Sequence, residues 1–168
     1  FYLDLVRAHT FARDGGTPWT PPLSILFALD VALDRYHAEG APHAWARHAR
    51  NAEAIRAFAQ AAGLRVFSQP NAHSVTVVAI AAPDGIDAST VIKELRERHG
   101  VVLGGGQADL KGKIFRMGTM GDITADDVLA ALAAFEQALA AQGFPARDGA
   151  FAAARSRLTE GRRPAGVA

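Results

Sequence analysis

The run from Val75 to Ala82 constrains the fold of this chain more than any other feature of its sequence. Valine, isoleucine and alanine fill it, and Thr76 is its only polar residue. A short run with so little polar alternation is typical of a strand that is buried on both faces. It is far shorter than the roughly 20 residues that a membrane-spanning helix needs. Apolar residues make up 49% of the chain, so we expect this strand inside a real core.

Apolar spacing, glycines, prolines and capping residues predict the other elements. After Gly40 the expected order is helix, two strands, helix, two strands and helix. This order predicts an α/β fold of the α+β type, with helices packed on a small mixed or antiparallel sheet. The expected helices cover residues 1–9, 20–40, 42–62, 87–100 and 124–142, and the expected strands cover residues 64–67, 75–82, 101–103 and 113–117. Residues 144–168 form an expected tail, partly helical near residues 151–158.

Capping residues mark the ends of these helices. Thr20 is the expected N-cap of the helix over residues 20–40, and Gly40 is its expected end. Asp87 and Thr124 are the expected N-caps of the two later helices. Asp127 follows Thr124 in the first turn, where the helix dipole favours negative charge.

The helix over residues 42–62 has an apolar residue at every third or fourth position. The face that we expect to be buried comprises Trp45, Ala49, Ala52, Ile55 and Ala59. The face that we expect in solvent carries Arg47, Arg50 and Arg56.

Charge and cysteine content exclude several classes of function. The chain has 18 basic and 17 acidic side chains, which gives no reason to propose a nucleic acid or a membrane surface as a partner. It has no cysteine, so a disulfide framework and a thiolate metal site are excluded. The histidines show no metal-binding spacing, and no serine lies in a nucleophile elbow, so we predict no metal site and no hydrolase triad.

Arg116 is the first candidate for a binding residue. It lies in the expected strand after a Gly-rich loop, Gly104–Gly106. A guanidinium there either points to a site or pairs with an acid. A site arginine would bind a carboxylate through two parallel charge-assisted hydrogen bonds. The alternative is an arginine in solvent or in a structural ion pair.

Three segments in order resemble a known family. They are FYLDL at residues 1–5, TPWTPPLSILFALDVAL at residues 17–33 and GGGQADLKGKIFRMGTMG at residues 104–121. Together they look like the second half of class V pyridoxal-phosphate aminotransferases, in the alanine–glyoxylate and serine–pyruvate group. The resemblance covers about residues 1–142.

The resemblance implies the C-terminal part of a fold type I transferase. Residues 1–38 would end the large cofactor domain and include a linking helix, and residues 39–143 would form the small C-terminal domain, followed by the tail. The cofactor would be pyridoxal 5'-phosphate, in a cytoplasmic homodimer with active sites at the subunit interface. The family's Schiff-base lysine lies upstream of the segment that matches FYLDL. We therefore expect no catalytic residue in this chain and no activity from the chain alone.

The resemblance also implies roles for single residues. Arg116 matches the family's arginine that binds the substrate carboxylate, within its Arg-x-Gly stretch. Thr20 and Thr17 match the segment that reaches the cofactor phosphate of the neighbouring subunit. Lys111 and Lys113 flank Gly112 in a polar turn, so we expect both in solvent and reject them as the Schiff-base lysine.

The implied reaction transfers an amino group from alanine or serine to glyoxylate or pyruvate. An amino-acid lyase or a phosphoserine-type transaminase of the same class stays open, whereas a cysteine desulfurase would need the cysteine that this chain lacks. A non-catalytic α+β module that binds a ligand or a partner is the third alternative.

Overall fold

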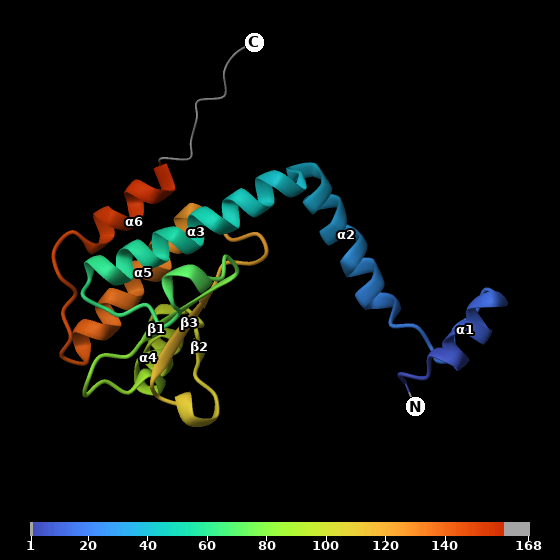
Figure 1. The fold of residues 1–168 in the computed structure, drawn as a ribbon, viewed down its shortest axis with the longest axis horizontal. Helices are drawn as coiled ribbons and strands as arrows, with labels where there is room; N and C mark the ends of the chain where they lie inside the picture. Colours follow the sequence, from blue (N-terminus) through green and yellow to red (C-terminus); the bar gives the residue numbers. More distant parts are fainter. Residues whose placement is uncertain (1, 160–168) are drawn as a thin grey trace, which may run out of the picture. The chain divides into compact units, whose positions relative to one another are not determined.

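The computed structural model describes residues 2–159 (Figure 1). The described residues form two compact units, which divide between Ala44 and Trp45. We had expected a boundary between residues 38 and 39, but the helix that follows Gly40 contributes its first turn to the first unit. The two units are described separately.

The first unit contains helix α1, Leu5–Arg13, and helix α2, Leu23–Glu39. Helix α1 begins later than the expected residues 1–9 because the side chain of Asp4 accepts a hydrogen bond from the backbone N–H of Arg7. Helix α2 ends at Gly40 as expected, where φ is 82° and only glycine is unstrained.

The prediction that Thr20 is the N-cap of α2 is wrong. Pro22 occupies the N-cap position, and no side chain caps the helix. The residue before a proline is pushed out of the helical region, so the two prolines at positions 21 and 22 keep Thr20 outside the first turn. Its hydroxyl is therefore two residues too early to reach the free N–H groups of the helix.

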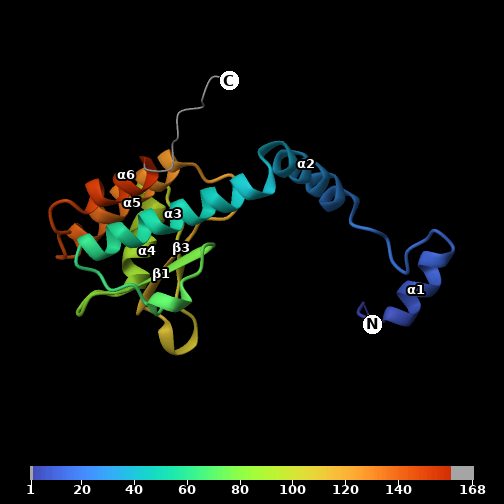
Figure 2. The same cartoon turned by 45° about the horizontal axis from the view of Figure 1, so that its top comes forward.

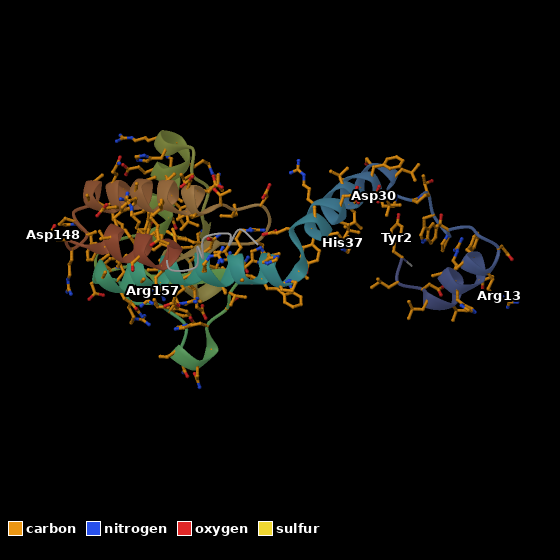
Figure 3. The ribbon with its side chains drawn as sticks, turned by 90° about the horizontal axis from the view of Figure 1, so that it is seen from above. Tyr2, Arg13, Asp30, His37, Asp148 and Arg157 are labelled. Carbon is orange, nitrogen blue, oxygen red and sulfur yellow. The ribbon has the colours of Figure 1, made fainter. Side chains whose placement is uncertain are left out.

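Helix α2 has no buried residue. Its exposed apolar side chains include Leu23, Ile25, Leu26, Phe27, Leu29, Val31 and Leu33. Figure 3 shows the side chains of this helix standing out from it, with Asp30 and His37 labelled. So much apolar surface on one helix is more than a soluble monomer ordinarily exposes.

The second unit is built on a three-stranded antiparallel sheet. Its strands are β1, Val77–Ala81, β2, Gly104–Gly105, and β3, Ile114–Gly118, in the order β1–β3–β2. The strand expected over residues 64–67 is reduced to a single bridge between Val66 and Ile80. The strand expected over residues 101–103 is absent, and pairing begins only at Gly104.

The prediction that residues 75–82 are buried on both faces is wrong at the start of the run. Val78 and Ile80 are buried on one face, whereas Val75 and Val77 are 45% and 40% exposed. The helices pack on the face that contains Val78 and Ile80. On the opposite face of the strand, Val77 is exposed and only Ala81, at the end of the strand, is buried.

Four helices surround the core face of the sheet. They are α3, Ala41–Ala61, α4, Ala88–His99, α5, Ala125–Ala141, and α6, Ala150–Thr159. Phe135 of α5 lies at the centre, with its ring centroid 4.9 Å from Phe115 of β3 and 6.4 Å from Phe58 of α3. Short 3₁₀ turns at Pro70–Ala72 and Ala108–Leu110 complete the described elements.

Helix α6 corrects the assignment of residues 144–168 to a tail. Ala150, Ala154 and Leu158 are buried and belong to the core, and α6 lies beside α5 in Figures 1 and 2. Ala150 and Ala154, four positions apart, let this helix approach α5 closely. An alanine-rich segment does not show from its sequence which of its alanines are buried. Residues 160–168 of the expected tail lie outside the described residues.

The prediction for the two faces of α3 is partly wrong. Ala52, Ile55 and Ala59 are buried as expected, but Trp45 is 62% exposed. Arg56, assigned to solvent, is only 7% exposed, and Arg47 is half-buried. Arg50, also assigned to solvent, is half-buried as well. The arginine face of the helix meets two loops, one near residue 74 and one over residues 121–123.

None of the helices in residues 2–159 is long and apolar enough to cross a membrane. Within the same residues no three His, Asp or Glu side chains lie close enough together to hold a metal ion.

Thr124 is the N-cap of helix α5, as predicted, and it forms a capping box with Asp127. The hydroxyl of Thr124 donates to Asp127 Oδ2 at 2.6 Å, and its backbone N–H donates to the same oxygen at 2.8 Å. The backbone N–H of Asp127 donates to the Thr124 hydroxyl at 3.1 Å. These bonds from Thr124 hold the pKa of the Asp127 carboxyl below its usual value.

We expect Asp127→Asn to lower the free energy of unfolding at neutral pH. A carboxyl whose pKa is lower in the folded state stabilises that state above its unfolded pKa, and the contribution disappears as the pH falls through the folded pKa. The stability difference between the native chain and the variant should therefore be full at pH 7 and shrink from about pH 4 downward. Urea unfolding followed by circular dichroism across that range measures it. Asp126→Asn is the matched control, because it removes the same charge from the same turn but lies outside the capping box. An equal loss of stability in both variants would contradict a specific contribution from the capping box.

Candidate functional site

Arg116 projects from the face of the sheet opposite the core. It lies in β3 between Phe115 and Met117, which are both buried among the helices. Successive side chains of a strand point to opposite faces, so Arg116 points away from them. Its partners in the register are Ala79 on β1 and Gly104 on β2, two small residues. The guanidinium therefore lies on a part of the sheet that no large side chain of the neighbouring strands covers.

A single hydrogen bond fixes this guanidinium within the described residues. Arg116 is half-buried, and its Nε donates to the backbone carbonyl of Gly105 at 2.7 Å. Among residues 2–159 it has no ion pair with an aspartate or glutamate, so the structural ion pair of the alternative interpretation is not present there. The Nη1 and Nη2 groups keep their donors for another acceptor.

The Gly-rich loop packs closely because its glycines have no side chains. A Cβ on Gly106 would overlap the backbone carbonyl of Leu110, and a Cβ on Gly112 would lie 2.6 Å from Asp87 Oδ1. Between these glycines Ala108 has a φ of 46°, a left-handed value that is uncommon for a residue other than glycine. The loop is thus a tight turn, and it connects β2 to β3.

Three side chains of α3 hold the segment that follows β3. Arg47 Nη1 donates to the carbonyls of Gly121 and Ile123 at 2.8 and 3.2 Å. Asn51, which is buried, donates to the Ile123 carbonyl at 2.9 Å. His48 Nε2 lies 3.5 Å from the Gly121 carbonyl. The sequence analysis missed this role; the signal for it is polar residues one turn apart on a helix, at positions 47 and 51.

Thr119 fixes the same segment from the other side. It is fully buried, and its hydroxyl donates to the carbonyl of Val75 at 2.7 Å. Arg116 thus lies between a rigid loop on the N-terminal side of its strand and an anchored segment on the C-terminal side. Both supports come from the second unit.

Thr17 and Thr20 lie in the first unit, beside a hollow of about 740 Å³ lined by Tyr2 and residues 17–21. The hydroxyl of Thr17 donates to the carbonyl of Trp19 at 2.6 Å. Thr20 is exposed, and its hydroxyl has no hydrogen-bond partner among residues 2–159. Only Thr20 therefore offers a free hydroxyl proton to an anion.

Trp19 is half-buried. Its ring packs edge-on against Tyr2 with centroids 5.2 Å apart, and the guanidinium of Arg7 lies 4.3 Å from its centroid. These contacts give the segment over residues 17–21 a defined shape within the first unit.

The lysines do not fit a Schiff base. Lys111 and Lys113 are exposed, as expected for the polar turn around Gly112. Lys93, the only other lysine in the sequence, is 73% exposed and lies 4.0 Å from Glu97. A lysine that holds an aldehyde cofactor needs a desolvated setting to lower its pKa. None of the three lysines has such surroundings.

Comparisons with known proteins identify the family. No protein-family model matches the chain. Serine–glyoxylate aminotransferase of Methylorubrum extorquens is 38% identical, covering 84% of this chain and 36% of that protein. The crystal structure of pyridoxamine–pyruvate aminotransferase from Mesorhizobium loti superimposes with a TM-score of 0.83 at 37% identity, covering 89% of this chain and 39% of that one. The chain matches the C-terminal part of class V pyridoxal-phosphate aminotransferases.

This match confirms the family and the fold class predicted from the sequence. The chain spans only about two fifths of the length of the relatives it matches. One of them, the small subunit of a soluble hydrogenase from Synechococcus, is 38% identical over 94% of this chain and 41% of its own length. The roles of Arg116, Thr17 and Thr20 as class V aminotransferase residues stay predictions.

We expect Gly106→Ala to destabilise the second unit by about 1–3 kcal/mol, because the new Cβ has no room beside the Leu110 carbonyl. Urea unfolding of the chain measures the loss. Gly118→Ala is the matched control, since a Cβ there meets nothing within 4 Å and φ is not left-handed. A loss no larger than that of the control would show that the turn relaxes without cost.

Proposed function

We propose that the protein containing this chain is an aminotransferase that transfers an amino group from alanine or serine to glyoxylate or pyruvate. The observation that carries the proposal is the guanidinium of Arg116, which is fixed by the Gly105 carbonyl and whose Nη groups have no partner among residues 2–159, in a chain related to class V aminotransferases. Such a group binds the carboxylate that every amino acid and 2-oxo acid presents. The named reactions of the relatives differ in their amino donors, so the donor is part of the proposal.

Pyridoxal phosphate, when bound, would supply the electron sink for this chemistry. Within the described residues, Thr20 fits its phosphate, because an exposed hydroxyl with a free proton can donate to a phosphate oxygen. Thr17 fits less well, since its hydroxyl proton is donated to the Trp19 carbonyl. The Schiff-base lysine would come from a part of the protein outside this chain, because Lys93, Lys111 and Lys113 are all exposed.

Arg116 would bind and orient the substrate. Two parallel hydrogen bonds to the carboxylate fix the position of the α-carbon, and a fixed position converts binding energy into rate. The Gly105 carbonyl holds the Arg116 side chain, and Thr119 anchors the end of its strand. The arginine would therefore not shift to accommodate a misplaced substrate. An amino-acid lyase or a phosphoserine-type transaminase of the same class would use the arginine in the same way, and product analysis separates them.

We expect Arg116→Ala in the complete protein to raise the apparent KM for alanine or serine about 10- to 100-fold, the effect of losing a charge-assisted hydrogen-bond pair. A coupled assay for pyruvate or glycine formation measures it. Arg98→Ala is the control, because Arg98 is 76% exposed and pairs only loosely with Glu94, at 3.7 Å. An unchanged KM in Arg116→Ala would count against the proposed function. Product formed without an acceptor would point to a lyase instead.

We further propose a homodimer in which a second copy covers part of α2. The support is the continuous apolar surface of that helix, which no part of its own unit buries. The phosphate contact of Thr20 would then be to the cofactor of the partner subunit, as the resemblance implies. The cytoplasmic location stays a prediction.

We expect the isolated chain to elute from size-exclusion chromatography as a dimer or a larger species, because α2 leaves its apolar surface in water. Ile25 and Phe27 are 65% and 68% exposed, so replacing both with lysine should shift the chain toward the monomer without loss of helix by circular dichroism. A clean monomer of the unchanged chain would contradict the proposed interface.

A further inference from the structure

We propose that Gly104 and Gly105 set the direction in which Arg116 binds a carboxylate: end-on, through Nη1 and Nη2, and not through the edge that contains Nε. This inference rests on the proposed aminotransferase function, because it assumes that Arg116 binds the substrate carboxylate. Gly104 and Gly105 are then positioning residues, which act on the substrate only through the guanidinium.

The argument begins with the donors of a guanidinium. Two of its edges can form a pair of parallel hydrogen bonds to a carboxylate, the edge with Nε and Nη2 and the edge with Nη1 and Nη2. The N–H of Arg116 Nε donates to the Gly105 carbonyl at 2.7 Å, a short bond for an N–H donor. A carboxylate on that edge would have to displace the carbonyl. Within residues 2–159, the edge whose two donors both lack a partner is therefore the pair of Nη1 and Nη2.

The backbone of β2 fixes the position of the Gly105 carbonyl that accepts this hydrogen bond. Gly105 pairs with Phe115 in the register, so its carbonyl is held by the sheet and not by a side chain that could rotate. Phe115 is fully buried, which ties the position of that carbonyl to the core. A side-chain acceptor would lose rotamer entropy in this role, whereas a strand carbonyl is already fixed.

Gly104 provides the space that the guanidinium occupies. It pairs with Arg116, so a side chain there would point to the same face as the arginine. A Cβ on Gly104 would lie 3.4 Å from both Nε and Nη2 of Arg116. Contacts of this length lie at the short end of the ordinary range, so the Cβ would fill the space on this side of the guanidinium and restrict the positions open to it. The φ of Gly104 is not left-handed, so alanine there strains no backbone and acts on the arginine alone.

The decisive experiment compares Gly104→Ala, Arg116→Ala and the double variant in the complete protein. Steady-state assays give KM for alanine, and single-turnover assays give the reaction rate with alanine and with ethylamine, which has no carboxylate. We expect Gly104→Ala to raise the KM for alanine about 5-fold with little change in kcat, since a misplacement of about 1 Å at a site costs up to about 100-fold. The rate with ethylamine should not change. In the double variant Gly104→Ala should add nothing to Arg116→Ala.

Each other outcome contradicts a named step. An equal loss with alanine and ethylamine would show that Gly104 has only a structural role, and it would overturn the inference. Native KM in Gly104→Ala beside a large loss in Arg116→Ala would overturn the inference and leave the proposed function standing. Native KM in Arg116→Ala would overturn the proposed function itself.

A second measurement needs no variant and so does not depend on how Gly104→Ala folds. A crystal structure of the complete protein with bound pyruvate should place the two carboxylate oxygens within hydrogen-bond distance of Arg116 Nη1 and Nη2, with Nε still on the Gly105 carbonyl. A carboxylate on Nε, with the Gly105 carbonyl displaced, would overturn the inference.

Discussion

The register between β3 and its two neighbours is the constraint on which the rest of this structure depends. It sends Phe115 and Met117 to the core, where Phe115 lies against Phe135, and Arg116 to the other face. A slip of one residue would exchange the faces and bury the guanidinium without a partner. Burying an unpaired charge costs several kcal/mol, so the same packing that stabilises the core also determines where the arginine points.

The glycines of the loop and the polar residues of α3 act on the two ends of the same strand. A Cβ at Gly106 would overlap the backbone of Leu110, and a Cβ at Gly112 would crowd the side chain of Asp87. Arg47 and Asn51 satisfy carbonyls of the segment after β3 that would otherwise lack partners. Neither group touches a site directly. Both reduce the number of positions open to a strand of only five residues, Ile114–Gly118.

The helix ends could be predicted from the sequence because the signals are local. Asp87 caps α4 through the N–H of Ser89, Thr124 caps α5, and Gly40 and Gly100 end their helices, all as expected. Each of these depends on contacts within one turn.

The errors come from contacts between segments far apart in the chain. Arg56 is a charged residue of the kind that usually faces solvent. Its Nη1 nevertheless donates to the backbone carbonyl of Ser74, 18 residues away in the chain. Residues 101–103 have strand propensity, yet pairing begins only at the two glycines that follow, which lie opposite Arg116 and Phe115. The position of Arg116 in the candidate site followed from its motif, whereas its bond to Gly105 could not be predicted without the register.

The two candidate parts of the site differ in what they depend on. Every described contact that places Arg116 comes from the second unit: the carbonyl of Gly105, the pairing with Ala79 and the anchored Thr119. Thr20 belongs to the first unit, whose longest helix leaves its apolar side chains uncovered. The geometry around the Arg116 guanidinium is therefore encoded within a unit that has its own core. The phosphate contact proposed for Thr20 depends on the other unit, so we expect a substitution in one unit to affect only one of the two proposed roles.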